Sequence, residues 1–152
     1  MILAPQILPA TAPMTRPSIW PIWLAALWWG SLTTLGFGVV PLLFAHLPTP
    51  AMAGGMAAKL FTAQTWVSGA CGLLLLMISR QNRPPDPEYR AYPATIFIAG
   101  GLLLAFLVEF AVAPRIIARE NLKLWHAVGS AMYLVQWLCA GATLWKLARD
   151  RN

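Results

Sequence analysis

Charged residues are scarce in this chain. Of its 152 residues only 11% are Asp, Glu, Lys or Arg, whereas ordinary soluble domains are about 25% charged. Hydrophobic residues make up 59% of the chain, eight tryptophans are present, and the mean hydropathy is +0.62. So little polar sequence cannot shield the apolar runs from water, which excludes a soluble globular domain. The composition predicts a small polytopic membrane protein.

Cysteines and catalytic motifs are also scarce. The two cysteines, Cys71 and Cys139, lie inside apolar runs and form no CxxC motif. A membrane disulfide oxidoreductase needs thiols near the aqueous face, where they exchange with partner proteins. No nucleophile–base pair or cofactor fingerprint is visible, and the loops are too short to build a lid. We therefore expect a protein that is not an enzyme, with two buried, inert thiols.

Four apolar runs dominate the sequence, at residues 19–44, 60–78, 94–113 and 124–148. Each has about the 20 residues that a helix needs to cross a bilayer. The chain therefore predicts an all-α fold, an integral membrane four-helix bundle formed by one domain over residues 19–148. No internal repeat is convincing, although the first and third runs both end near a proline, Pro41 and Pro114.

The first 18 residues predict a proline-rich tail. Prolines at four-residue spacing keep this segment from forming a helix; they are Pro5, Pro9, Pro13 and Pro17. Met14 offers an alternative start, which leaves open whether residues 1–13 are translated.

Basic residues lie at the ends of the runs rather than in one stripe, so we expect no nucleic-acid partner. The positive-inside rule places the side richer in Lys and Arg in the cytoplasm. Seven Lys and Arg residues lie on the side of the two termini: Arg16, Arg80, Arg83, Arg90, Lys146, Arg149 and Arg151. Four lie on the opposite side: Lys59, Arg115, Arg119 and Lys123. Both termini are therefore predicted to be cytoplasmic, and the lipid bilayer to be a bacterial inner membrane.

Glu109 is the one carboxylate inside an apolar run. A charge in hydrocarbon is costly and is a functional-site hypothesis by default. Four residues from the end of its run, it has a predicted depth of about 6 Å. His46, Gln64 and His126 fall in the same layer on other runs. The alternative is a shallow carboxylate that pairs with nearby basic residues, namely Arg115, Arg119 or Lys123.

Two imidazoles and a carboxylate suit a divalent transition metal, and the nearby thioethers of Met52 and Met56 favour reduced copper. We therefore predict His46, Glu109 and His126 as ligands of copper or another transition metal. In the fourth run, small and polar residues at helical spacing predict a face that points into the bundle; they are His126, Gly129, Ser130, Tyr133, Gln136, Ala140 and Thr143. The predicted ligand- or proton-binding residues are Glu109, His126, Gln64, Ser130 and Tyr133. Interhelical hydrogen bonding remains open for Gln64, His126 and Tyr133, as does an exposed loop position for His46.

Several short motifs resemble a known family. They are the end of the first run (Val40, Pro41, Phe44), the sequence KLF at residues 59–61, Pro114, and the Trp125, His126 step. Together, over about residues 25–145, they resemble the TMEM205-like membrane proteins, whose bacterial branch is a four-span domain of unknown function of the DUF4149 type. The resemblance implies four spans and supports His126. In that family a serine follows the histidine by three positions, where this chain has Gly129 with Ser130 beside it.

Three functions remain open. The first is binding of a metal ion or small cationic ligand in the Glu109 layer, for metal handling or transport. The second is a structural accessory subunit of a larger membrane complex or a homo-oligomer. Gly30, Thr34 and Gly38 support it, because their four-residue spacing forms a face that another helix can approach closely. The third is proton-coupled transport, in which Glu109 exchanges a proton.

Overall fold

The computed structural model describes residues 18–81 and 93–150, and every element in these ranges is helical. The predicted proline-rich tail and most of the central loop lie outside the described residues. The first span consists of α1 (Trp20–Thr33), the π-helical segment η1 (Thr34–Val39) and α2 (Val40–His46), and the second span is α3 (Pro50–Gln81). The third span consists of α4 (Pro93–Leu107), the π-helical segment η2 (Val108–Val112) and α5 (Ala113–Ile117), and the fourth span is α6 (Leu122–Arg149).

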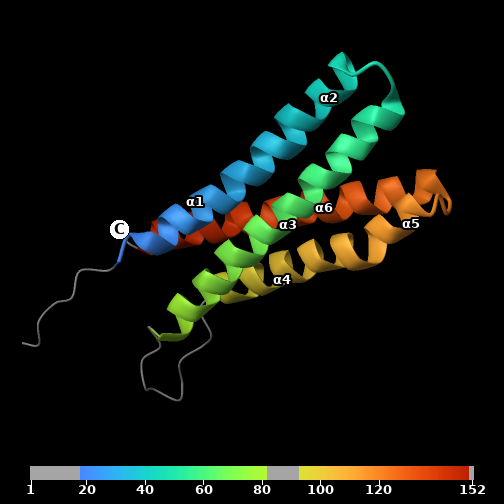
Figure 1. Ribbon diagram of the computed structural model, residues 1–152. Coiled ribbons are helices and arrows are strands. Elements are labelled where there is room, and N and C mark those ends of the chain that lie inside the picture. The colour runs from blue at the N-terminus through green and yellow to red at the C-terminus, as the bar shows by residue number, and fades with distance from the viewer. Residues whose placement is uncertain (1–17, 82–92, 151–152) are drawn as a thin grey trace, which may run out of the picture.

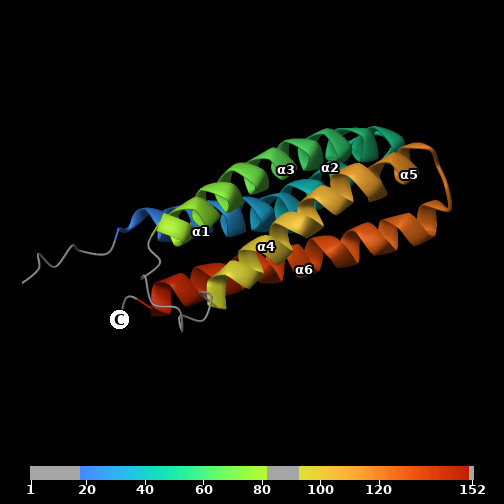
Figure 2. The ribbon, with the colours of Figure 1, turned by 90° about the horizontal axis from the view of Figure 1, so that it is seen from below.

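All four spans are long and apolar enough to cross a bilayer. They form two hairpins: α1–η1–α2 pairs with α3, and α4–η2–α5 pairs with α6 (Figures 1 and 2). The turns at residues 47–49 and 118–121 lie at the same end of the molecule, which we call the hairpin end; the opposite end is the terminal end. The tips of the two hairpins are separated at the hairpin end (Figure 1). The all-α four-span prediction is confirmed, and the orientation in the membrane stays a prediction.

Side-chain caps determine where the second helix of each hairpin begins. The Thr49 hydroxyl accepts a hydrogen bond from the Met52 backbone N–H at 3.2 Å, and the Asn121 side chain accepts one from the Leu124 N–H at 3.4 Å. Such caps satisfy backbone donors that the first turn leaves unpaired. Because Thr49 caps the helix and Pro50 opens it, the second span begins ten residues before the predicted range of 60–78.

The prediction that the third span ends at residue 113 is wrong, because the helix continues through Pro114 to Ile117. Proline lacks the N–H that a helix interior requires. Here it follows η2 directly, where the hydrogen-bond ladder changes register and a missing donor is tolerated. Glu109 therefore lies eight residues, about 12 Å, from the end of its helix, and its depth in the membrane stays a prediction.

The core is centred on Trp28, which is fully buried together with Leu32 and Ile98. The indole lies directly over Gly101 of α4, where an added Cβ would stand 2.8 Å from its Cη2 atom. The absence of a side chain at Gly101 therefore leaves room for the indole, which reaches from the first span across the core to the third.

Candidate functional site

A buried chain of hydrogen bonds crosses the centre of the bundle. Gln64 donates through Nε2 to the hydroxyls of Ser31 at 2.9 Å and Ser68 at 3.4 Å. Gln136 donates to the same Ser68 hydroxyl at 3.1 Å. The amides of both glutamines are thus engaged within the bundle. This chain joins the first, second and fourth spans, and it gives Gln64 an interhelical role in packing.

Tyr133 and Trp137 attach the fourth span to the first. The Tyr133 hydroxyl donates to the Leu32 carbonyl at 2.8 Å, and the Trp137 indole donates to the Thr33 hydroxyl at 2.8 Å. The Tyr133 ring also covers Gly36, where an added Cβ would stand 2.5 Å from its Cε1 atom. Tyr133 is therefore held by packing and by a backbone acceptor next to η1.

The two histidines are engaged with their own helices. The Nδ1 atom of His46 lies 3.0 Å from the Leu42 carbonyl, and that of His126 lies 2.8 Å from the Leu122 carbonyl. Both side chains are exposed. Within residues 18–81 and 93–150 no group of three or more His, Cys, Asp or Glu side chains gathers into a metal site. The structure does not assemble His46, Glu109 and His126 into such a group, and their role as ligands stays a prediction.

The face of the fourth span differs in part from the expected one. Gln136, Ala140 and Thr143 are buried, as expected, whereas His126 and Ser130 are exposed. Ser130 lies six residues before Gln136, which turns it about 120° away from the buried face. His126 follows the turn at residues 118–121 by five residues and is therefore near the hairpin end, where the tips of the two hairpins are separated (Figure 1).

Glu109 forms a polar contact between the two hairpins. The Thr62 hydroxyl of α3 donates to its Oε1 atom at 2.9 Å. Glu109 is half-buried and Thr62 is exposed, so the pair lies at the lipid-facing surface. Thr62 is not among the residues predicted from the sequence, although its position two residues before Gln64 places it at a comparable depth.

Arg115, one expected partner of Glu109, is engaged elsewhere. Its guanidinium donates to the Ala111 carbonyl at 3.0 Å and lies 4.5 Å from the ring centroid of Trp125. The hydrogen bond that the Glu109 carboxyl accepts therefore comes from the uncharged Thr62 hydroxyl.

Aromatic residues lie close to this pair along both helices. Phe106 and Phe110 stack with ring centroids 6.1 Å apart, and an added Cβ on Gly69 of α3 would stand 3.6 Å from the Phe106 ring. Phe110 and Trp66 are each 66% exposed. Trp66 lies one turn after Thr62 on α3, and helical residues four apart share a face. We call this surface the Glu109 face; it consists of Thr62, Trp66, Phe106, Glu109 and Phe110.

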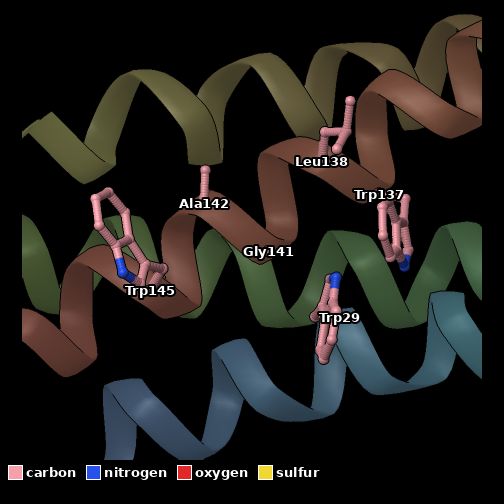
Figure 3. Close-up of a pocket in the computed structure, with 6 residues that line it drawn as sticks. All are labelled: Trp29, Trp137, Leu138, Gly141, Ala142 and Trp145. Carbon is pink, nitrogen blue, oxygen red and sulfur yellow. The ribbon is translucent and has the colours of Figure 1, made fainter.

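A separate apolar groove of about 400 Å³ lies between α1 and α6 (Figure 3). Three indoles flank two small residues there; its lining is Trp29, Trp137, Leu138, Gly141, Ala142 and Trp145. None of these residues is a predicted ligand, and none is titratable at physiological pH. The groove is therefore a feature of helix packing that is distinct from the Glu109 face.

Comparison with known proteins identifies a family. Residues 23–124 match DUF4149, which is described as a domain of unknown function. No curated protein and no solved structure matches the chain. The matched range contains nearly all of the first three spans, including Glu109, and ends before Trp125 and His126. The wider TMEM205-like grouping stays a prediction. Because the match covers two thirds of the sequence, the chain belongs to the DUF4149 family.

Proposed function

We propose that the protein binds a positively charged ligand within the bilayer at the Glu109–Thr62 pair, in the handling or transport of that ligand. The observation that supports the proposal is a carboxyl group about 12 Å from the helix end whose contact is a neutral hydroxyl. An ionised carboxylate in hydrocarbon is unfavourable unless a proton or a cation compensates its charge. The Thr62 bond orients Oε1, and Oε2 is the atom that would meet the ligand.

The local backbone supports this assignment. Glu109 lies in η2, and π-helical turns within α-helices are frequent at functional sites. Carboxyl and hydroxyl oxygens are hard donors, whereas reduced copper prefers sulfur ligands. We therefore favour a cationic ligand other than copper. A proton would compete with this ligand for the same carboxyl group, so proton-coupled transport is an extension of the proposal.

The test uses a hydrophobic carbodiimide, which modifies protonated carboxyl groups that lie in a bilayer. The purified protein in lipid nanodiscs is treated with the reagent, and the modified residue is located by mass spectrometry. We expect modification of Glu109 that decreases as zinc, sodium, tetramethylammonium or tetraphenylphosphonium is added. Glu120, which lies in the turn after α5, is the internal control. Modification of Glu109 that none of these cations reduces would overturn the proposal.

A structural accessory or homo-oligomeric role is the second candidate. A Cβ added to Gly30 or Gly38 would meet nothing within 4 Å, whereas one added to Gly36 would meet Tyr133. The small-residue face of the first span is therefore available to a helix of another chain. Cross-linking in native membranes from a cysteine at Thr34 tests this role. We expect a discrete cross-linked species that Gly30→Leu abolishes, and random cross-linking would count against the role.

A further inference from the structure

We propose that the ligand of the Glu109 face is a lipophilic organic cation that carries aromatic groups and enters sideways from the lipid. This inference rests on the proposed function and specifies its ligand class. The juxtaposition that carries it is a carboxyl group and exposed aromatic rings on one lipid-facing surface between α3 and η2.

The location of the face determines the route of entry. Thr62, Trp66 and Phe110 are exposed on the sides of spans that cross the membrane. The groove of Figure 3 is lined by other residues and does not include the Glu109 face. A ligand that is dissolved in the lipid reaches the carboxyl directly, whereas an ion from the water must cross hydrocarbon beside the protein.

The cost of that crossing selects the kind of cation. Transfer of a compact ion from water into a low-dielectric medium carries a large Born penalty. The penalty falls as the ionic radius grows, so a large cation with dispersed charge partitions into the bilayer far more easily than sodium or zinc. Bulky organic cations are therefore the ligands that reach the highest concentration in the bilayer around Glu109.

The aromatic residues complement such a ligand. Aromatic faces attract cations, most strongly when both groups are desolvated, and they stack on the ligand's own rings. Phe106 is held against Gly69, and Phe110 stacks on Phe106 while it remains exposed. Phe106 lies about one helical turn before Glu109 and Phe110 directly follows it, so the stacked rings form an apolar wall on the adjacent side of the helix from the carboxyl, which supplies the complementary charge.

The first hairpin supplies a matched control within the same molecule. Phe37 stands 73 residues before Phe110 and is likewise exposed, at 56%. The residue before it is Gly36, where the residue before Phe110 is Glu109. Phe37 thus offers an aromatic surface without a carboxyl group, and the proposal predicts that it binds no cation.

Equilibrium dialysis of tetraphenylphosphonium against the protein in nanodiscs tests the proposal. We expect saturable binding of one cation per chain, at least about tenfold weaker in Glu109→Gln, because a charged partner contributes more than about 1.4 kcal/mol. Phe110→Leu should weaken binding by about twofold to fivefold, as the loss of one cation–π contact implies. Phe37→Leu should bind as the unaltered protein does. Tetramethylammonium, which lacks aromatic groups, should bind more weakly.

The other outcomes separate this inference from the proposed function. If zinc or tetramethylammonium protects Glu109 from the carbodiimide and tetraphenylphosphonium does not, the ligand class is wrong and the cation site stands. If tetraphenylphosphonium binds equally well to Glu109→Gln, it partitions nonspecifically and the inference fails. If none of the tested cations protects Glu109, both proposals fail. Identical gel-filtration profiles for the variants establish that a loss of binding is not a loss of folding.

Discussion

The two hairpins share a short motif around their π-helical segments, and the residue before this motif is glycine in one and glutamate in the other. The first hairpin contains the sequence FGVVP at residues 37–41, and the second hairpin contains FAVAP at residues 110–114. Phe, Val and Pro therefore recur 73 residues apart. Each sequence overlaps a π-helical segment, η1 or η2. The residue that precedes it is Gly36 in the first hairpin and Glu109 in the second.

The second helices of the hairpins also correspond. Gln64 and Gln136, which are 72 residues apart, are both buried and both donate to Ser68. The pairs Gly69, Ala70 and Gly141, Ala142 follow at the same spacing. The two hairpins therefore carry several of the same residue types at corresponding places. These matches are few and scattered through a uniformly apolar background, so they do not form a repeat that the sequence alone reveals.

The corresponding positions Gly36 and Glu109 make different kinds of contact. At Gly36 the Tyr133 ring fills the space beside the helix and its hydroxyl binds the neighbouring Leu32 carbonyl. At Glu109 a carboxyl group faces lipid. Within the part of the chain that the structure describes, its hydrogen-bond partner is the Thr62 hydroxyl. One hairpin uses this position for packing, and the other keeps a polar group there that packing does not require.

Transfer of the carboxyl to the first hairpin should have the largest effect. In Gly36→Glu the new side chain occupies the space of the Tyr133 ring, and it brings a charge into the bundle. We expect destabilisation by more than about 3 kcal/mol, since overpacking and an intramembrane charge add. Unfolding in sodium dodecyl sulfate, followed by tryptophan fluorescence, measures it. The double variant with Tyr133→Ala should recover part of the loss, and a tolerated Gly36→Glu would refute the packing role of this position.

Two glycines of the same helix provide a finer comparison. We expect Gly36→Ala to cost about 1–3 kcal/mol, because its methyl group meets the Tyr133 ring. Gly38→Ala should leave monomer stability within about 0.5 kcal/mol, since its methyl group meets open space. The same unfolding assay compares the two. Equal effects would mean that the ring moves aside easily.

The sequence predicted the elements of the fold better than the contacts between them. Apolar length alone predicts four spans, because backbone polar groups in lipid must be satisfied within helices. The end of the third helix was placed too early because Pro114 does not end a helix that has just passed through a π-helical segment. Helical periodicity describes one helix at a time, so it does not reveal that the hairpins separate near His126. Thr62 was missed because its contact with Glu109 depends on the register between two spans.

Replacement of the two equivalent glutamines should give smaller, unequal effects. Gln64 donates to two hydroxyls and Gln136 to one. Interhelical hydrogen bonds in membranes average about 0.6 kcal/mol, and each glutamine makes one, to Ser31 or to Ser68. We therefore expect about 0.6 kcal/mol for Gln136→Leu and slightly more for Gln64→Leu, which also loses the longer bond to Ser68 of its own helix. A double-mutant cycle should show coupling between the two, since both bind Ser68. Additive losses would mean that Ser68 does not connect the spans energetically.

The carboxyl itself should matter least for stability. Glu109→Gln retains a side-chain oxygen that accepts the Thr62 hydroxyl, and it removes the charge, so we expect a change within about 0.5 kcal/mol. Thr62→Val removes the hydrogen bond and should cost about 0.6 kcal/mol. The unfolding assay used for the glycines measures both variants. If Glu109→Gln instead unfolded the protein as readily as Gly36→Ala does, the carboxyl would be a packing element like its counterpart in the first hairpin. A stable Glu109→Gln protein that no longer binds cations would assign this position to ligand binding.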